Sequence, residues 1–253
     1  MTSKERVMKT MAHEEPDRIP LDLGGCNNTC MHNLVEQRVK QALGLADHGL
    51  NIKCRLQGVV LPDPSVVDYF GVDTCSIYIN EVRPWVDNGD GTFHDMWGIT
   101  TKLNPDGYYY NRIGHPLEHI ESVEDIEKFE IPEPNAYMLE GLSERLNANA
   151  DKCCILEGMW EQMFGLPSWL RGNTNFYMDL MEDDGLSDAL LSKLLAYYKK
   201  LVSFVLDAIG DRIDIVKVAD DLGTQNIERH WTSSFRRGCS REKAVSAMAG
   251  SSI

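Results

Sequence analysis

Acidic side chains stand at the ends of two apolar segments, where strands are predicted to stop. Glu157 lies at the end of the run 152–158, and Asp220 and Asp221 end the run 213–219. A carboxylate at such a position can transfer a proton or hold a ligand hydroxyl. Successive strand residues point to opposite sides, so only one of the two aspartates faces a pocket. A salt bridge at Glu157 and a helix-capping role for the aspartates are the alternatives.

A second group of residues has the chemistry of metal ligands. Cys26, Cys30 and His32 follow the first predicted strand, and thiolates and imidazole bind zinc. They supply at most three ligands, in an uncommon spacing. We therefore interpret the cysteines as small buried thiols and expect no metal here.

Two tryptophans are candidates for contact with a flat ligand. Trp97 and Trp160 can line the face of a tetrapyrrole or corrinoid, or they can pack in the core, which is the more common use of such rings. We keep Trp160 among the substrate-binding candidates.

Composition excludes several classes of protein. The net charge of −14 disfavours nucleic acid as a partner, because phosphate backbones are repelled. Hydrophobic residues make up 43% and charged residues 25%, as in a globular protein with a sizeable core. There is neither a run of 18 apolar residues nor a signal peptide at the start of the sequence. We expect a cytoplasmic protein with reduced thiols that acts on a small molecule and binds no membrane.

The predicted elements alternate between strands and helices. A capping box at Thr2 and Glu5 begins a first helix, and a second capping signal begins at Ser122. Leucines at helical spacing predict a long helix over 190–209 that Gly210 ends. Further segments are predicted as strands at 18–25, 72–79, 152–158 and 213–219, as a helix at 34–43, and as a β excursion at 82–112 with a hairpin turn at 88–91.

This order predicts an α/β fold with a parallel sheet. Four barrel-type strands are expected, near Leu21, Cys75, Leu156 and Val218. A closed (β/α)8 TIM barrel needs eight. We therefore expect an incomplete barrel over residues 1–225, with the β-hairpin excursion inserted.

The last segment, 226–253, has a different composition. It carries five basic residues against two acidic ones, six serines and few apolar residues in register. Such a segment cannot offset the entropy of ordering its backbone. We expect a divergent, loose tail here, as a frameshift after Gln225 would produce; a genuine tail that docks as a helix is the alternative.

Four phrases in order resemble the uroporphyrinogen decarboxylase superfamily. The phrases are TSKERV with HEEPDRIP at 2–20, DMWG at 95–98, LEG at 156–158 and DDLGTQ at 220–225. The last three resemble its methyltransferase-like branch, which includes corrinoid-dependent enzymes that methylate coenzyme M. The resemblance implies a TIM-type barrel with its active site at the carboxyl ends of the strands. It also implies a substrate-site role for Asp220 or Asp221 and for Gln225.

The decarboxylase branch fits this sequence less well. Its Arg-rich phrase after the first strand is replaced by LDLGGCNN at 21–28, and the position of its catalytic aspartate falls near Asn80. A substrate with eight carboxylates needs cationic side chains to hold it. Asn80 is kept as a substrate-binding candidate.

In the methyltransferase branch, thiol-acting members hold zinc through a His-x-Cys phrase and a later cysteine. Only His230 and Cys239 are late candidates here, and their spacing does not match. We expect methyl transfer between a corrinoid protein and a small acceptor in intact relatives, and an inactive, truncated chain here. Decarboxylation of uroporphyrinogen and a non-catalytic binding surface are the alternative functions.

Overall fold

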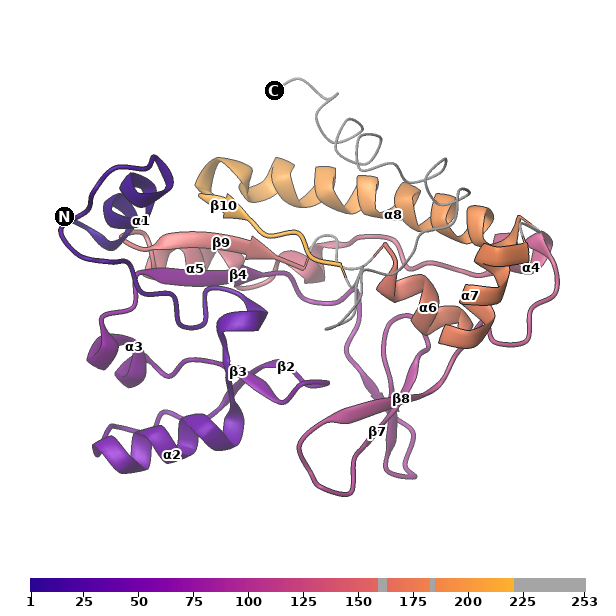
Figure 1. Ribbon diagram of the computed structural model, residues 1–253, viewed down its shortest axis with the longest axis horizontal. Helices are drawn as coiled ribbons and strands as arrows, with labels where there is room; N and C mark the ends of the chain where they lie inside the picture. The colour runs from indigo at the N-terminus through magenta and orange to yellow at the C-terminus, as the bar shows by residue number, and fades with distance from the viewer. Residues whose placement is uncertain (159–162, 183–184, 221–253) are drawn as a thin grey trace.

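The computed structural model describes residues 1–158, 163–182 and 185–220 (Figure 1). In these ranges the chain is a mixed α/β protein with one parallel and two antiparallel sheets. The described part contains no helix long and apolar enough to cross a membrane.

The parallel sheet is the centre of the fold. It consists of β4 (Thr74–Tyr78), β9 (Cys153–Glu157) and β10 (Ile215–Val216), in the order β10-β9-β4. All residues of β9 are buried, as expected for a central strand of a parallel sheet. Because its strands are parallel, all three carboxyl ends lie at one edge of the sheet.

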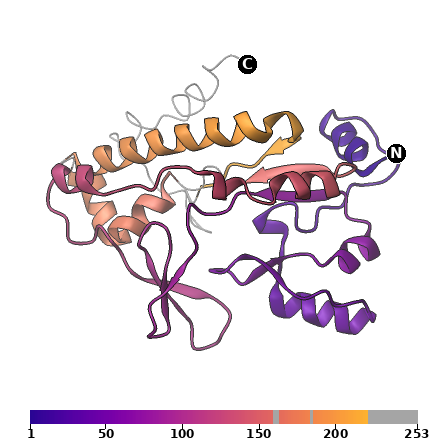
Figure 2. The ribbon, with the colours of Figure 1, turned by 180° about the vertical axis from the view of Figure 1, so that it is seen from behind.

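A long helix, α8 (Leu186–Ile209), runs along one face of this sheet (Figures 1 and 2). Its buried side chains recur every three to four residues and form one core with Ile77 of β4 and Leu156 of β9. The helix begins after Gly185, whose φ is +84°, and ends at Gly210. The other helices after residue 120 are α4 (Val123–Lys128), α5 (Leu142–Ala148), α6 (Gly165–Arg171) and α7 (Asn173–Glu182). Two 3-10 turns, η2 (Ala136–Leu139) and η3 (Gly210–Arg212), lie in the same part of the chain.

The other half of the molecule carries both antiparallel sheets. One has the order β1-β3-β2 and lies near two helices; the other is the meander β5-β6-β7-β8. The first group comprises β1 (Met31–His32), β2 (Asn51–Cys54), β3 (Val59–Leu61), α2 (Asn33–Leu43), α3 (Pro64–Phe70) and the 3-10 turn η1 (Asn27–Thr29). The meander comprises β5 (Val86–Asp87), β6 (Thr92–His94), β7 (Thr100–Leu103) and β8 (Tyr110–Gly114).

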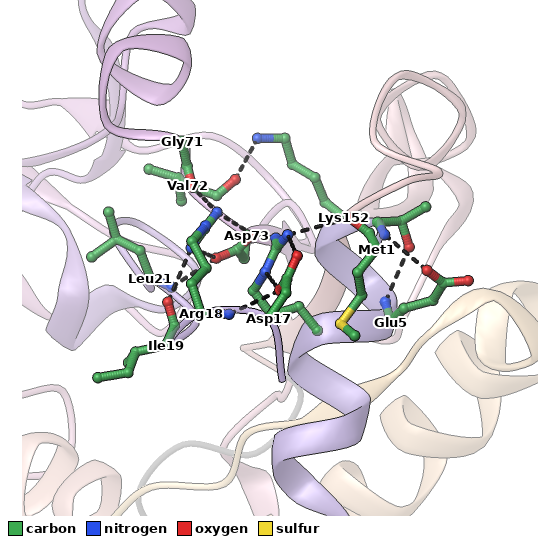
Figure 3. A network of polar contacts seen from close by, with 12 residues as sticks. Met1, Glu5, Asp17, Arg18, Ile19, Leu21, Gly71, Val72, Asp73 and Lys152 are labelled. Atoms are coloured by element: carbon green, nitrogen blue, oxygen red, sulfur yellow. Dashed lines mark hydrogen bonds and ion pairs between the residues drawn. The ribbon is translucent and has the colours of Figure 1, made fainter. Parts of the chain in front are cut away.

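The N-terminal helix α1 (Ser3–Met11) is fastened to the sheet by a buried ionic network (Figure 3). Asp73, which directly precedes β4, is fully buried and accepts hydrogen bonds from Arg6 at 2.6 Å and Arg18 at 2.7 and 2.9 Å. Arg6 also binds Asp17 at 2.6 and 2.9 Å. This network lies at the amino ends of the strands, the end of an α/β sheet that supports stability rather than catalysis.

The predicted capping box holds: the Thr2 hydroxyl accepts from Glu5 N–H, and the Glu5 carboxylate accepts from Thr2 N–H. The helix predicted at 34–43 and the hairpin turn at 88–91 are also present. Within the predicted β excursion, however, residues 92–99 do not form one continuous strand. Asp95 accepts from the N–H groups of Trp97 and Ile99, which turns the chain between β6 and β7.

The strand predicted at 18–25 does not form. That segment runs beside the start of β4, but Asp73 N–H donates to Leu21 O while Leu21 N–H is taken by the Asp73 carboxylate. Side-chain bonding thus replaces the strand ladder. Three of the four expected barrel strands are present, and the described residues form no closed barrel. The expected tail, 226–253, lies outside the described residues.

Candidate functional site

The site lies at the carboxyl edge of the parallel sheet, around Glu157. This residue ends β9 and is only 2% exposed. Val216 of β10 pairs with Leu156, so the next residue, Lys217, stands beside Glu157. The Lys217 ammonium lies 2.5 Å from Glu157 Oε1 and 2.7 Å from Asn28 Oδ1.

Two further donors reach the same carboxylate from distant parts of the chain. Lys53 of β2, whose side chain is 5% exposed, binds Glu157 Oε2. The backbone N–H of Asn27, at the start of η1, donates to both carboxylate oxygens at 2.9 Å. We call Glu157, Lys53, Lys217 and Asn27 the Glu157 centre. It joins the parallel sheet to the β1-β3-β2 sheet.

These donors set the charge state of Glu157. Burial alone would raise the pKa of its carboxyl group, but hydrogen bonds from Lys217, Lys53 and the Asn27 backbone outweigh burial and hold the pKa below its usual range. Glu157 is therefore ionised at neutral pH. It cannot act as a general acid there, whereas it can fix the positions of both ammonium groups.

The predicted C-x3-C-x-H group lies next to this centre. Burial is the largest cause that raises the pKa of the Cys30 thiol to about 11, so Cys30 is a neutral thiol. His32 accepts from Leu34 N–H through Nδ1, and its Nε2 contacts Tyr108 O at 3.2 Å. Across residues 1–158, 163–182 and 185–220, no three His, Cys, Asp or Glu side chains are placed to hold a metal ion.

Asp220 has a different environment. Its carboxylate accepts from the N–H groups of Phe164 at 2.9 Å and Gly165 at 3.2 Å, which are at the beginning of α6. This contact matches the helix-capping role given above as the alternative for the two aspartates. Glu157 and Asp220 have different partners among these contacts. Because Glu157 and the two aspartates end neighbouring predicted strands, the sequence predicts that Glu157 and either Asp220 or Asp221 face a shared cavity, and this stays a prediction.

The other predicted site residues divide into two groups. Asn80 donates from its side chain to Tyr137 O at 2.9 Å and from its backbone to Met138 O at 3.0 Å, so it ties the end of β4 to η2. Asp221, Gln225 and Trp160 lie outside the described residues. Trp97 packs edge-on against Tyr197, with ring centroids 5.2 Å apart, as the core interpretation expects.

Neither lysine of the Glu157 centre was among the site residues predicted from the sequence. Lys217 carried a signal, because it is the one charged residue in the apolar stretch 215–219 and follows strand alternation from Ile215. Lys53 carried none, because β2 is short and stands 104 positions from Glu157.

Comparison with solved structures supports the fold class. The whole chain aligns with 68% of a methyltransferase from Methanosarcina mazei, with a TM-score of 0.54 and 14% sequence identity. At this identity the likeness concerns the fold alone. No family model matches the sequence, and no curated protein does.

Proposed function

We propose that this chain belongs to a methyltransferase-type α/β protein that transfers a methyl group between a corrinoid protein and a small acceptor. The fold likeness to the Methanosarcina mazei methyltransferase and the phrases that resemble the methyltransferase branch support this proposal. The observation that carries it is the buried, ionised Glu157, which holds two ammonium groups where α/β proteins bind substrates.

In this proposal the lysines act on the acceptor. An acceptor must offer a lone pair, and it does so best as an anion such as a thiolate. A nearby ammonium group lowers the pKa of an acidic acceptor and holds its anion. Lys53 has three N–H donors, and its contact with Glu157 uses one. Glu157 fixes the direction of the donors that remain.

The transfer itself needs no redox partner. The bond between cobalt and the methyl carbon of the donor breaks, and its electron pair stays on the donor. The lone pair of the acceptor forms the new bond to carbon. Zinc, which the resemblance implies for thiol-acting members, does not fit the described side chains, so no step is assigned to it.

The test is a reaction of the purified chain with free methylcobalamin and a panel of small thiols, followed by the loss of the methylcobalamin absorbance spectrum. The sequence alone predicts an inactive chain, but the Glu157 centre is formed entirely by described residues, and this leads us to propose activity instead. We therefore expect thiol-dependent loss with the wild-type chain and at least a tenfold slower reaction with Lys53→Met. Lys199→Met is the matched control, because it removes the same charge from an exposed position on α8. No reaction above the protein-free rate, or equal rates for both variants, would oppose the proposal.

A further inference from the structure

A small cavity lies at the opposite end of the parallel sheet from the Glu157 centre. It has a volume of about 190 Å³ and is lined by Lys4, Leu146, Ala150, Lys152, Cys154 and Arg212. Half of these residues are cations, in a chain whose net charge is −14. Cations from α1, the start of β9 and η3 thus meet at one place.

Each cation has only part of its bonding capacity used by the contacts around it. Lys152 donates to Val72 O at 2.8 Å, with its side chain visible in Figure 3, and Arg212 donates to Asn147 Oδ1 at 2.6 Å. Lys4 pairs with Asp214 at 2.6 Å. A lysine has three donors and an arginine five, so N–H groups remain for a ligand.

The lining itself favours an anion, because it contains three cations and no acid. Asp214, which pairs with Lys4, and Asp151 act on the Cys154 thiol from outside the lining. Cations often bind the free carbonyl groups at the C-terminus of a helix, here α5. Lys152 instead donates to Val72 O, and Arg212 donates to the Asn147 side chain, so these contacts do not serve to cap α5.

Size narrows the class of ligand. Pockets for drug-sized molecules usually measure about 300–1,000 Å³, and this cavity is smaller. Arginine and lysine together provide the forked and point-charge donors that recognise tetrahedral oxyanions. We propose that Lys4, Lys152 and Arg212 form a binding site for a small oxyanion of the phosphate or sulfate type. The site is separate from the Glu157 centre and independent of the proposed methyl transfer.

The test is a calorimetric titration of the full chain with inorganic phosphate, in a phosphate-free buffer at constant ionic strength. We expect saturable binding that equal concentrations of chloride do not reproduce. Loss of one charge-assisted hydrogen bond should weaken binding roughly tenfold to hundredfold, so Arg212→Met and Lys152→Met should each show that change. Arg212→Lys should retain more affinity than Arg212→Met.

Lys199→Met again serves as the matched control and should bind phosphate like the wild type. Arg212 is the deciding position if Lys152→Met does not fold, because the hydrogen bond of its side chain within the described residues is an exposed one to Asn147. Thermal unfolding gives a second measurement, since a ligand that binds the native state raises Tm with its concentration. An absence of saturable binding, or an equal effect of Lys199→Met and Arg212→Met, would overturn the proposal.

Discussion

Replacement of Glu157 by glutamine tests whether the Glu157 centre is a genuine buried ion cluster. The substitution keeps the size of the side chain and removes its charge. It leaves the ammonium groups of Lys53 and Lys217, with side chains 5% and 20% exposed, beside an amide that cannot neutralise them. The side-chain amide nitrogen that replaces one carboxylate oxygen cannot accept a hydrogen bond from Lys53, Lys217 or the Asn27 N–H, so at least one of these contacts is lost.

The magnitude follows from burial. Removal of one partner from a buried ion pair typically costs about 3–5 kcal/mol, because the remaining charge is desolvated without compensation. Lys217 is partly exposed, so we expect the lower end, about 3 kcal/mol. For a chain of this size, that loss lowers Tm by roughly 6–12 °C. The double variant Glu157→Met/Lys53→Met should be more stable than Glu157→Met alone.

Urea and thermal unfolding, followed by circular dichroism, measure this effect. Glu133→Gln is the matched control: Glu133 pairs with Lys200 at 2.8 Å, but both side chains are more than 60% exposed. Such surface pairs contribute at most about 1 kcal/mol. If the free energies of unfolding of Glu157→Gln and Glu133→Gln differ by less than about 0.5 kcal/mol, the Glu157 centre is not the stabilising cluster described here.

The pH dependence gives an independent check on the same residue. The pKa of Glu157 is lower in the folded state than in the unfolded chain. Its stabilising contribution is therefore fully present above the unfolded pKa of about 4.3 and is lost as pH falls through the folded value. The stability difference between wild type and Glu157→Gln should thus shrink in acid. A difference that is constant between neutral and acidic pH would contradict the assigned charge state.

Three further substitutions test other parts of the structure. Asp73→Asn should cost about 3–5 kcal/mol in urea unfolding, because the fully buried carboxylate binds both Arg6 and Arg18; a loss below 1 kcal/mol would refute this role. Burial raises the pKa of Glu36, so its ionised form destabilises the folded state at pH 8. Glu36→Gln should therefore leave the chain as stable or more stable at pH 8, and this gain should vanish in acid. A clear loss of stability at pH 8 would be contrary evidence. Asp220→Ala should cost about 0.5–2 kcal/mol and Asp220→Asn less, as for a helix cap; equal losses would argue against capping.

Elements with strong local signals could be predicted from the sequence. The long helix α8 has apolar residues at helical spacing and a glycine after its last residue, and the structure shows both features. The central strand β9 is a continuous apolar run, which is typical of a strand covered on both faces. In both cases the chain segment itself contains the information.

The missed features depend on side-chain contacts, most of them between distant parts of the chain. The segment 18–25 has the composition of a strand, but Asp73 takes the N–H of Leu21 that a ladder would use. The turn at Asp95 depends on a side chain that binds the backbone, which strand propensity does not register. Lys53 joins the Glu157 centre only because β2 folds over the edge of the sheet. A charge network of this kind is set by tertiary structure and leaves no local periodicity.

The central claim is that the Glu157 centre orients an acceptor for methyl transfer, and transfer of an isotopic label tests it most directly. The chain is mixed with methylcobalamin that carries ¹³C in its methyl group and with a thiol acceptor, and the label is followed by NMR. We predict that ¹³C appears on the sulfur of the acceptor with the wild-type chain, at least tenfold more slowly with Lys53→Met, and at the wild-type rate with Lys199→Met. A label that stays on cobalt, or that moves equally fast with Lys53→Met, would contradict the account.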